Sequence, residues 1–327
     1  MSLFKKLRII PPEYARSKGD ARKFWTTLLV VFILVLIFSP ELRYRLRSLL
    51  EYPLHYKEYK QFGIRIPGRY KTHGIDVSRW QRRVDWERVK KMKVGNIQVK
   101  FAFMKATEGT WIKDPEFERN WKGAREAGII RGAYHFFLPN LSVKDQVLQF
   151  SRAVKLKSGD LPPVVDIEER RGMSKAQIQK YTKEFLELLE KHYKIRPVLY
   201  TNRDFYKNYF ADNEEFKDYR FWIAHYHVAD FDMPDDEDWH FWQHSDRGNV
   251  NGINEPVDFN VFNGDSVALR KLCMPCRFHA DVTQKSTYLI RTCSKSHSFS
   301  ITDLLATISA WNVAVAFLSF LLSRTSF

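Results

Sequence analysis

The hydrophobic positions between residues 72 and 265 follow two spacings that take turns along the chain. Short apolar or alternating runs are typical of strands, whereas apolar residues three and four positions apart are typical of helices. Helical spacing or a helix-starting motif marks several intervals, among them the Ser174–Gln177 capping box. The strand pattern recurs eight times, at residues 74–78, 97–106, 130–137, 162–169, 197–201, 220–226, 239–244 and 257–261.

Strands that alternate with helices predict an α/β fold built on a largely parallel sheet. Eight strands within about 190 residues are typical of a compact, TIM-like (β/α) barrel from which some helices are missing. We expect the barrel to close where the strand at 257–261 pairs with the strand at 74–78. In such barrels the functional side chains gather at the C-terminal ends of the strands.

The strand at 162–169 is apolar until it ends in carboxylates. Because side chains alternate along a strand, Asp166 and Glu168 share one face and Glu169 points to the other. Two residues on one face lie roughly 6–7 Å apart along the strand, a range that suits two carboxyl groups acting on one glycosidic bond. The simpler interpretation is a strand end with solvated acids, so the rest of the chain has to decide.

The other predicted strand ends carry polar and aromatic side chains. Together with the carboxylate pair they describe a carbohydrate-binding cleft, and they are Asp76, Glu108, His135, Tyr200, Tyr226, Gln243 and Asp258. Tryptophans can stack on sugar rings, although several will belong to the core because Trp is usually well buried. The candidates for stacking are Trp80, Trp111, Trp222 and Trp242.

The N-terminal flank contains an uncharged apolar run at residues 24–38, preceded by a basic segment at 1–23. The run is slightly shorter than the ~20 residues of a full membrane span. No small-residue cleavage site follows it, so we expect a transmembrane signal anchor at 24–40 rather than a cleaved signal peptide or a buried core helix. The preceding positive charges predict a single-pass protein with its catalytic part outside the cytoplasmic membrane, on the periplasmic or cell-wall side. Residues 41–71 predict a stalk.

The C-terminal flank, residues 266–327, follows the predicted barrel closure. Closure leaves no open sheet edge, and the flank has no long helical stripe, so we expect the barrel to fold without it. Residues 301–322 are moderately apolar, which leaves a second membrane segment, an unstructured tail or a shifted reading frame open. An irregular, zinc-like pattern is formed by Cys273, Cys276, His279, Cys293 and His297.

The net charge of +15 comes from the flanks. Residues 71–265 carry 32 Lys and Arg against 31 Asp and Glu. A nearly neutral central domain lacks the basic face of a nucleic-acid-binding protein, so we expect no nucleic-acid partner.

Ten short motifs occur in a fixed order, and together they resemble glycoside hydrolase family 25, the Chalaropsis-type lysozymes or N-acetylmuramidases. The resemblance covers about residues 72–265, and each motif alone is weak. The motifs are Gly74-Ile75-Asp76-Val77-Ser78-x-Trp80-Gln81, Asp85-Trp86, Lys105-Ala106-Thr107-Glu108-Gly109, Asp114-Pro115-x-Phe117, Gly132-Ala133-Tyr134-His135-Phe136, Asp166-x-Glu168-Glu169, Tyr200-Thr201, Trp222-Ile223-Ala224-x-Tyr226, Trp242-Gln243 and Val257-Asp258-x-Asn260-x-Phe262-Asn263-Gly264.

This resemblance implies a flattened, incomplete (β/α) barrel that hydrolyses the β-1,4 bond between N-acetylmuramic acid and N-acetylglucosamine in peptidoglycan. It implies that Glu168 is the general acid, that Asp166 is its partner, and that Asp76 and Asp258 are further acids of the cleft. No cofactor or metal is implied. The residues expected to bind substrate are Tyr134, His135, Tyr200, Trp222, Tyr226, Gln243 and Glu108.

Two mechanisms stay open. Asp166 attacks the anomeric carbon itself, or it orients the substrate's own 2-acetamido oxygen for attack, which the N-acetylated substrate favours. A metal-dependent deacetylase, suggested by His225-x-His227, is disfavoured because those histidines alternate with Trp222 and Tyr226. The remaining alternative is a catalytically silent peptidoglycan-binding module, and the intact set of four acids favours the enzyme. We expect a monomer whose partners are peptidoglycan and, through residues 24–38, the membrane.

Overall fold

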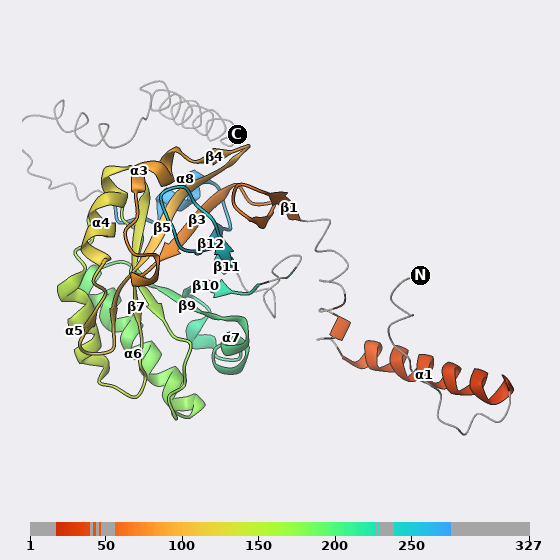
Figure 1. Cartoon of the computed structure of the whole chain (residues 1–327). Coiled ribbons are helices and arrows are strands. Elements are labelled where there is room, and N and C mark those ends of the chain that lie inside the picture. Colours follow the sequence, from red (N-terminus) through yellow and green to blue (C-terminus); the bar gives the residue numbers. More distant parts are fainter. Residues whose placement is uncertain are drawn as a thin grey trace, which may run out of the picture.

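The computed structural model describes residues 18–39, 42–43, 46, 56–226, 228 and 239–275 (Figure 1). Most of residues 56–226 and 239–275 fold around one continuous sheet. Eight of its strands close into a barrel, in the spatial order β3, β12, β11, β10, β9, β8, β7, β5 and back to β3. Their bounds are β3 (Thr72–Val77), β5 (Ile97–Glu108), β7 (Ile130–Phe136), β8 (Val164–Asp166), β9 (Val198–Asn202), β10 (Arg220–Ala224), β11 (Trp239–Gly248) and β12 (Val257–Phe262).

All eight predicted strands are present, and so is the predicted closure. Neighbouring strands from β3 through β5 and on to β11 run parallel. β12 is antiparallel to both of its neighbours, β11 and β3. As a result, the first residues of β12 lie at the same end of the barrel as the last residues of β3, and Asp258 pairs with Asp76. Two short strands, β4 (Lys93–Val94) and β6 (Ile112–Lys113), add to β5.

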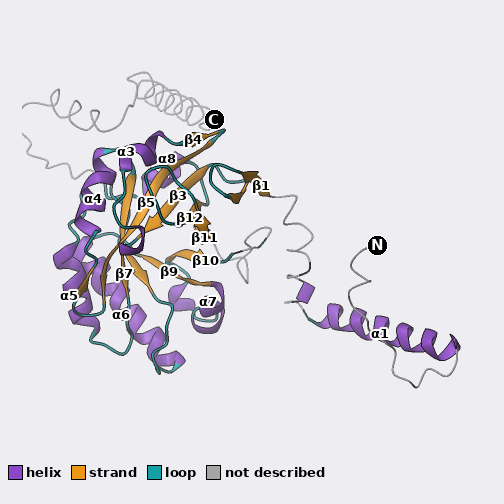
Figure 2. Ribbon diagram, viewed as in Figure 1, coloured by secondary structure: helices purple, strands orange, loops and turns teal. Residues whose placement is uncertain are grey.

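Two hydrophobic cores hold the barrel together. One fills its interior with side chains such as Phe103, Val164, Trp222 and Phe241. The other lies between the outside of the strands and the helices, with α4, α5 and α6 along one side (Figure 2). The helices of this layer are α3 (Trp86–Lys91), α4 (Phe117–Glu126), α5 (Val143–Ala153), α6 (Lys175–Tyr193) and α7 (Arg203–Tyr209). Two short 3-10 turns, η1 (Arg79–Gln81) and η2 (Glu214–Phe216), follow β3 and α7.

A β-hairpin covers the barrel beside β11 and β12, where the chain provides no helix between strands. It consists of β1 (Tyr56–Tyr59) and β2 (Ile64–Pro67), paired antiparallel. Phe62, at the hairpin turn, is fully buried and packs edge-on against Phe259 of β12 at 5.2 Å. Residues 56–71, which fall within the predicted stalk, are therefore part of the folded barrel unit.

The N-terminal end of the barrel is closed by α8 (Ser266–Leu272). Leu269 of this helix and Cys273 just after it are buried in the interior core. The backbone of Met274 exchanges hydrogen bonds with Gly159 and Asp160. Residues 266–275 of the predicted tail are therefore packed against the barrel, because a helix too short to show a period in the sequence seals an opening that the strands leave. That the barrel folds without residues 266–327 stays a prediction.

Helix α1 (Lys18–Phe38) contains the apolar run, and its side chains from Leu28 to Val35 are exposed. Among the residues that the structure describes, no helix has the combination of length and apolar composition that crossing a membrane requires. The predicted anchor at residues 24–40 is therefore not supported. The predicted tail beyond Pro275, with its apolar segment at 301–322 and four of its five Cys and His residues, lies outside the described residues.

Candidate active site

Four carboxyl groups come together at the C-terminal end of the barrel, where the sequence predicted them. Asp76 stands near the end of β3, and Asp258 near the start of the antiparallel β12. Asp166 is the last residue of β8, and Glu168 follows two residues later. Charge repulsion from Asp76 raises the pKa of the other three carboxyls, and repulsion from Glu168 raises the pKa of Asp166 and Asp258, so the four form one electrostatic cluster.

Asp76 is held by amide groups from two neighbouring strands. Its Oδ2 accepts hydrogen bonds from Gln243 Nε2 at 2.8 Å and from Asn260 Nδ2 at 2.7 Å. The other end of the Asn260 amide accepts from the indole of Trp222 at 2.8 Å. Because every donor in this chain has an acceptor, the Asp76 carboxyl is fixed in position.

Asp258 and Asp76 also share a hydrogen bond. Burial raises the pKa of Asp258 to about 9, and repulsion from Asp76 adds to the shift. Burial raises the pKa of Asp76 to about 6, opposed by the hydrogen bonds that it accepts. Asp258 therefore carries the proton at neutral pH and donates it to the Asp76 carboxylate, as expected for two acids that share one site.

Asp166 and Glu168 have different surroundings. Asp166 is 4% exposed, and its Oδ1 has no hydrogen-bond partner among the described residues. Burial raises its pKa well above the ordinary range, and repulsion from Glu168 adds to this. Burial also raises the pKa of Glu168, although a hydrogen bond from Asn202 opposes the shift. The raised pKa favours the protonated form of Glu168, and Asp166 Oδ1 is left available to a substrate group.

A buried cation stands beside these acids. Lys105 Nζ lies 2.7 Å from Glu108 Oε2, and the two side chains are 16% and 21% exposed. A register irregularity between Lys105 and Thr107 of β5 breaks the strict alternation of side chains there. The positive charge of Lys105 lowers the pKa of both Asp166 and Glu168. Glu108 therefore lies beside the acids, as the ion-pair partner of Lys105.

Tyr134, Tyr200, Tyr226 and Gln243 are the other polar side chains beside the four acids. The hydroxyls of Tyr200 and Tyr226 both donate to Gln243 Oε1, at 2.9 and 2.6 Å. Tyr134 contacts Trp222 edge-on at 6.3 Å, and burial followed by repulsion from Asp76 raises its pKa. These side chains lie beside the acids, as the sequence predicted.

Two predicted substrate-binding residues do not line the cleft. His135 is fully buried on the outer side of β7, where it bonds to Thr107 and Gln146 and stacks on Phe185 of α6. Adjacent residues of a strand point to opposite faces, so Tyr134 and His135 cannot both face the cleft. Trp222 is 1% exposed inside the barrel, where it stacks on Phe103. Its indole holds Asn260, which in turn donates to Asp76.

The candidate tryptophans divide in the same way. Trp242 is fully buried on the outer face of β11 under the hairpin, next to Tyr56 and Tyr70. Trp80 and Trp111, on loops that follow β3 and β5, are 69% and 68% exposed. Only these two indoles are available to a sugar ring among the four candidates.

The described parts of the chain contain no group of three or more His, Cys, Asp or Glu residues placed to hold a metal ion. His225 lies just beyond β10, and His227 is outside the described residues.

The sequence analysis missed three residues of the site, Lys105, Asn202 and Asn260. Lys105 and Asn260 stand inside the recognised motifs, and each is two or three residues from a predicted acid. Asn202 follows the Tyr200-Thr201 motif at the end of β9, caps α7, and also bonds to Glu168. Its position at a strand end was the signal that could have found it.

A closed α/β barrel with buried acids at the C-terminal strand ends defines a hydrolase site of the glycosidase kind. The family model described as "Glycosyl hydrolases family 25" matches residues 75–253. The chain belongs to this family and is a glycoside hydrolase.

Individual relatives agree with this assignment. The uncharacterized protein YegX of Escherichia coli K12 is 48% identical over 211 residues, which cover 64% of this chain and 76% of the relative. Lysozyme M1 of Streptomyces globisporus is 35% identical over 217 residues, with 62% and 71% covered. The structure of a family 25 glycosyl hydrolase from Bacillus anthracis matches with a TM-score of 0.58 at 30% identity, over 67% of this chain and 98% of the other.

Proposed function

We propose that this protein is a lysozyme-type muramidase that cleaves the β-1,4 bond between N-acetylmuramic acid and N-acetylglucosamine in peptidoglycan. The observation that carries the proposal is the cluster of four acids, in which Asp76 and Asp166 are buried and Glu168 has a raised pKa beside an Asp166 oxygen that has no partner among the described residues. Support also comes from the similarity to Lysozyme M1.

In this proposal Glu168 is the general acid. Its proton goes to the glycosidic oxygen as the bond from that oxygen to the anomeric carbon breaks. The same carboxylate then takes a proton from the water that attacks the anomeric carbon. A raised pKa fits this role because the group has to be protonated at working pH.

Asp166 acts by orienting the 2-acetamido group of the substrate. The free Oδ1 accepts the acetamido N–H, and the acetamido carbonyl oxygen attacks the anomeric carbon to give a cyclic intermediate that water opens. The incoming N–H and the charge of Lys105 both favour the carboxylate form of Asp166. Direct attack by Asp166 is the competing route, and trapping a covalent glycosyl–enzyme would show it.

Asp76 and Asp258, of which Asp258 carries the proton, lie beside the reacting sugar. Gln243 donates to Asp76 and is itself held by the tyrosine hydroxyls. All of these groups come from one chain, which supports action as a monomer. Because the substrate lies outside the cytoplasm, we place the working enzyme there, on the periplasmic or cell-wall side.

The test is digestion of purified peptidoglycan by the full chain. New reducing ends are reduced with borohydride and identified after acid hydrolysis, and we expect muramitol. The Glu168→Gln variant should lose about 10²–10⁴-fold in rate while keeping its fold. Glu169→Gln is the matched control, because Glu169 is half-exposed and pairs with Arg171. Glucosaminitol as the product, or near-normal activity of Glu168→Gln, would contradict the proposal.

A further inference from the structure

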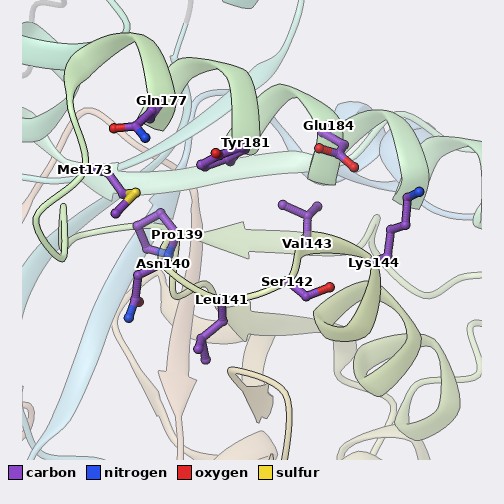
Figure 3. Close-up of a pocket in the computed structure, with 10 residues that line it drawn as sticks. All are labelled: Pro139, Asn140, Leu141, Ser142, Val143, Lys144, Met173, Gln177, Tyr181 and Glu184. Atoms are coloured by element: carbon purple, nitrogen blue, oxygen red, sulfur yellow. The ribbon is translucent and has the colours of Figure 1, made fainter.

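A groove lies outside the acid cluster, between the start of α6 and the loop that joins β7 to α5 (Figure 3). Its volume is about 450 Å³, within the range of ligand sites. Gln177, Tyr181 and Glu184 line it from α6, at the three- and four-residue spacing of one helix face. We propose that this groove binds the peptide stem that peptidoglycan carries on each muramic acid, an inference that rests on the proposed function.

One wall of the groove follows β8, which ends at Asp166, and the other follows the neighbouring strand β7. The loop wall begins after Phe137, whose N–H donates to the backbone oxygen of Asp166 at 2.7 Å. Met173, on the other wall, is five residues after Glu168, so the two Cα atoms are at most ~18 Å apart. An extended peptide of five residues spans roughly the same ~17 Å. A stem on the sugar at Glu168 therefore reaches the groove.

The lining fits a peptide better than a sugar. It combines polar side chains, among them Asn140 and Gln177, with aliphatic and thioether groups from Leu141, Val143 and Met173. One half-buried tyrosine, Tyr181, is its single aromatic side chain. The flat, exposed indoles that suit sugar rings are on other loops, at Trp80 and Trp111. Short peptides with alternating apolar and polar groups match such a lining.

Two charged side chains at one end of the groove indicate which part of a peptide would bind there. Lys144 of α5 and Glu184 of α6 lie together at the end opposite Met173 (Figure 3). Neither side chain forms an ion pair with a residue that the structure describes. A neutral sugar offers a charged partner to neither side chain. The diamino acid of a peptide stem supplies both, with a carboxylate for Lys144 and an ammonium for Glu184.

The experiment compares two soluble glycan substrates of equal chain length, one with stems intact and one with stems removed at the lactyl amide. The full chain is assayed as wild type, Lys144→Glu and Glu184→Lys. We expect each variant to raise KM on the stem-bearing glycan by about two- to fivefold, the effect of a partly exposed charge pair, with kcat unchanged. On the stem-free glycan both constants should stay within about twofold of wild type, because uniform binding is lost only where a stem exists.

Lys180→Glu is the matched control, since Lys180 is exposed on α6 but does not line the groove. It should change neither substrate's constants. The inference is overturned if Lys144→Glu and Glu184→Lys leave KM for the stem-bearing glycan unchanged, or shift KM equally for both glycans. If the wild type hydrolyses neither glycan, the proposed function itself fails, and the two failures are thereby distinguished.

Discussion

The two ends of the barrel each bury a carboxyl group to the same degree, with opposite consequences. At the N-terminal end, Asp160 accepts bonds from Arg131 Nε at 2.8 Å, from Arg131 Nη2 at 3.1 Å and from the Lys157 N–H at 2.7 Å. At the C-terminal end, Asp166 has an unpartnered oxygen and acidic neighbours. A buried charge is tolerated when it is paired, and an unpaired one marks a place where stability was given up for chemistry.

The largest loss of stability is expected at the N-terminal end of the barrel, where Asp160 is paired with Arg131. Asp160→Asn leaves the buried Arg131 guanidinium without its counter-charge, which costs about 3–5 kcal/mol. We expect the unfolding midpoint, measured by calorimetry, to fall by roughly 10 °C, while kcat/KM of the folded fraction is unchanged. Arg125→Ala is the control, because Arg125 is half-exposed and 3.5 Å from Asp160. Equal losses in both variants would show that the buried pair is not special.

The helix that seals the same end comes next. Leu269→Ala removes a fully buried side chain from the interior core. Such truncations cost about 2–4 kcal/mol. Val267→Ala, on the same helix and 57% exposed, should change the midpoint little. If chemical denaturation gives equal stabilities for the two variants, the packing of α8 against the end of the barrel does not stabilise the fold.

A smaller effect, this time a gain in stability, is expected at the C-terminal end of the barrel, where the acids lie. The folded state raises the pKa of Asp258 from 3.8 to about 9, so folding binds its proton more tightly. The stability from this group is complete below about pH 4 and is lost as the pH rises towards 9. Asp258→Asn, which cannot ionise, should therefore be more stable than the wild type by about 1–2 kcal/mol at pH 8 and by little at pH 4.

Urea unfolding of both proteins at the two pH values checks this prediction. The activity of Asp258→Asn should fall even as its stability at pH 8 rises. A stability difference that does not depend on pH would mean that Asp258 does not hold its proton in the folded protein.

The smallest effect concerns the cation of the site. Lys105 lowers the pKa of Glu168, so Lys105→Met should raise it. Glu168 has to be protonated to act, and a higher pKa keeps it protonated at higher pH. The basic limb of kcat/KM should therefore move to higher pH. Lys113→Met is the control, because Lys113 is exposed and pairs with Glu118. A downward shift would exclude this role.

Most of the barrel could be predicted because its strands are long, apolar or strictly alternating. The acids were found because each stands at the end of such a strand. His135 was misplaced although the alternation of β7 was visible, since the motif that contains it was followed in preference to the alternation rule. A register irregularity in β5 had the converse effect, because it brings Lys105 and Glu108 together against simple alternation.

The remaining misses have a different physical origin. The hairpin at residues 56–67 buries Tyr56, Phe62 and Ile66 at irregular spacing, because it packs across β11 and β12 rather than along one strand. Its burial depends on a surface made by residues almost two hundred positions later. α8 has seven residues, fewer than the window in which a helical period can be recognised. Such contacts appear only once the tertiary structure is known.

β12, the one barrel strand that is antiparallel to both of its neighbours, determines the end at which the chain leaves the barrel. β12 enters the barrel at the end that holds the acids and leaves at the opposite end, where α8 follows. β3, parallel to its partner β5, also begins at that opposite end. The chain therefore enters β3 and leaves β12 at the end of the barrel opposite the acids, and α8 packs at that end.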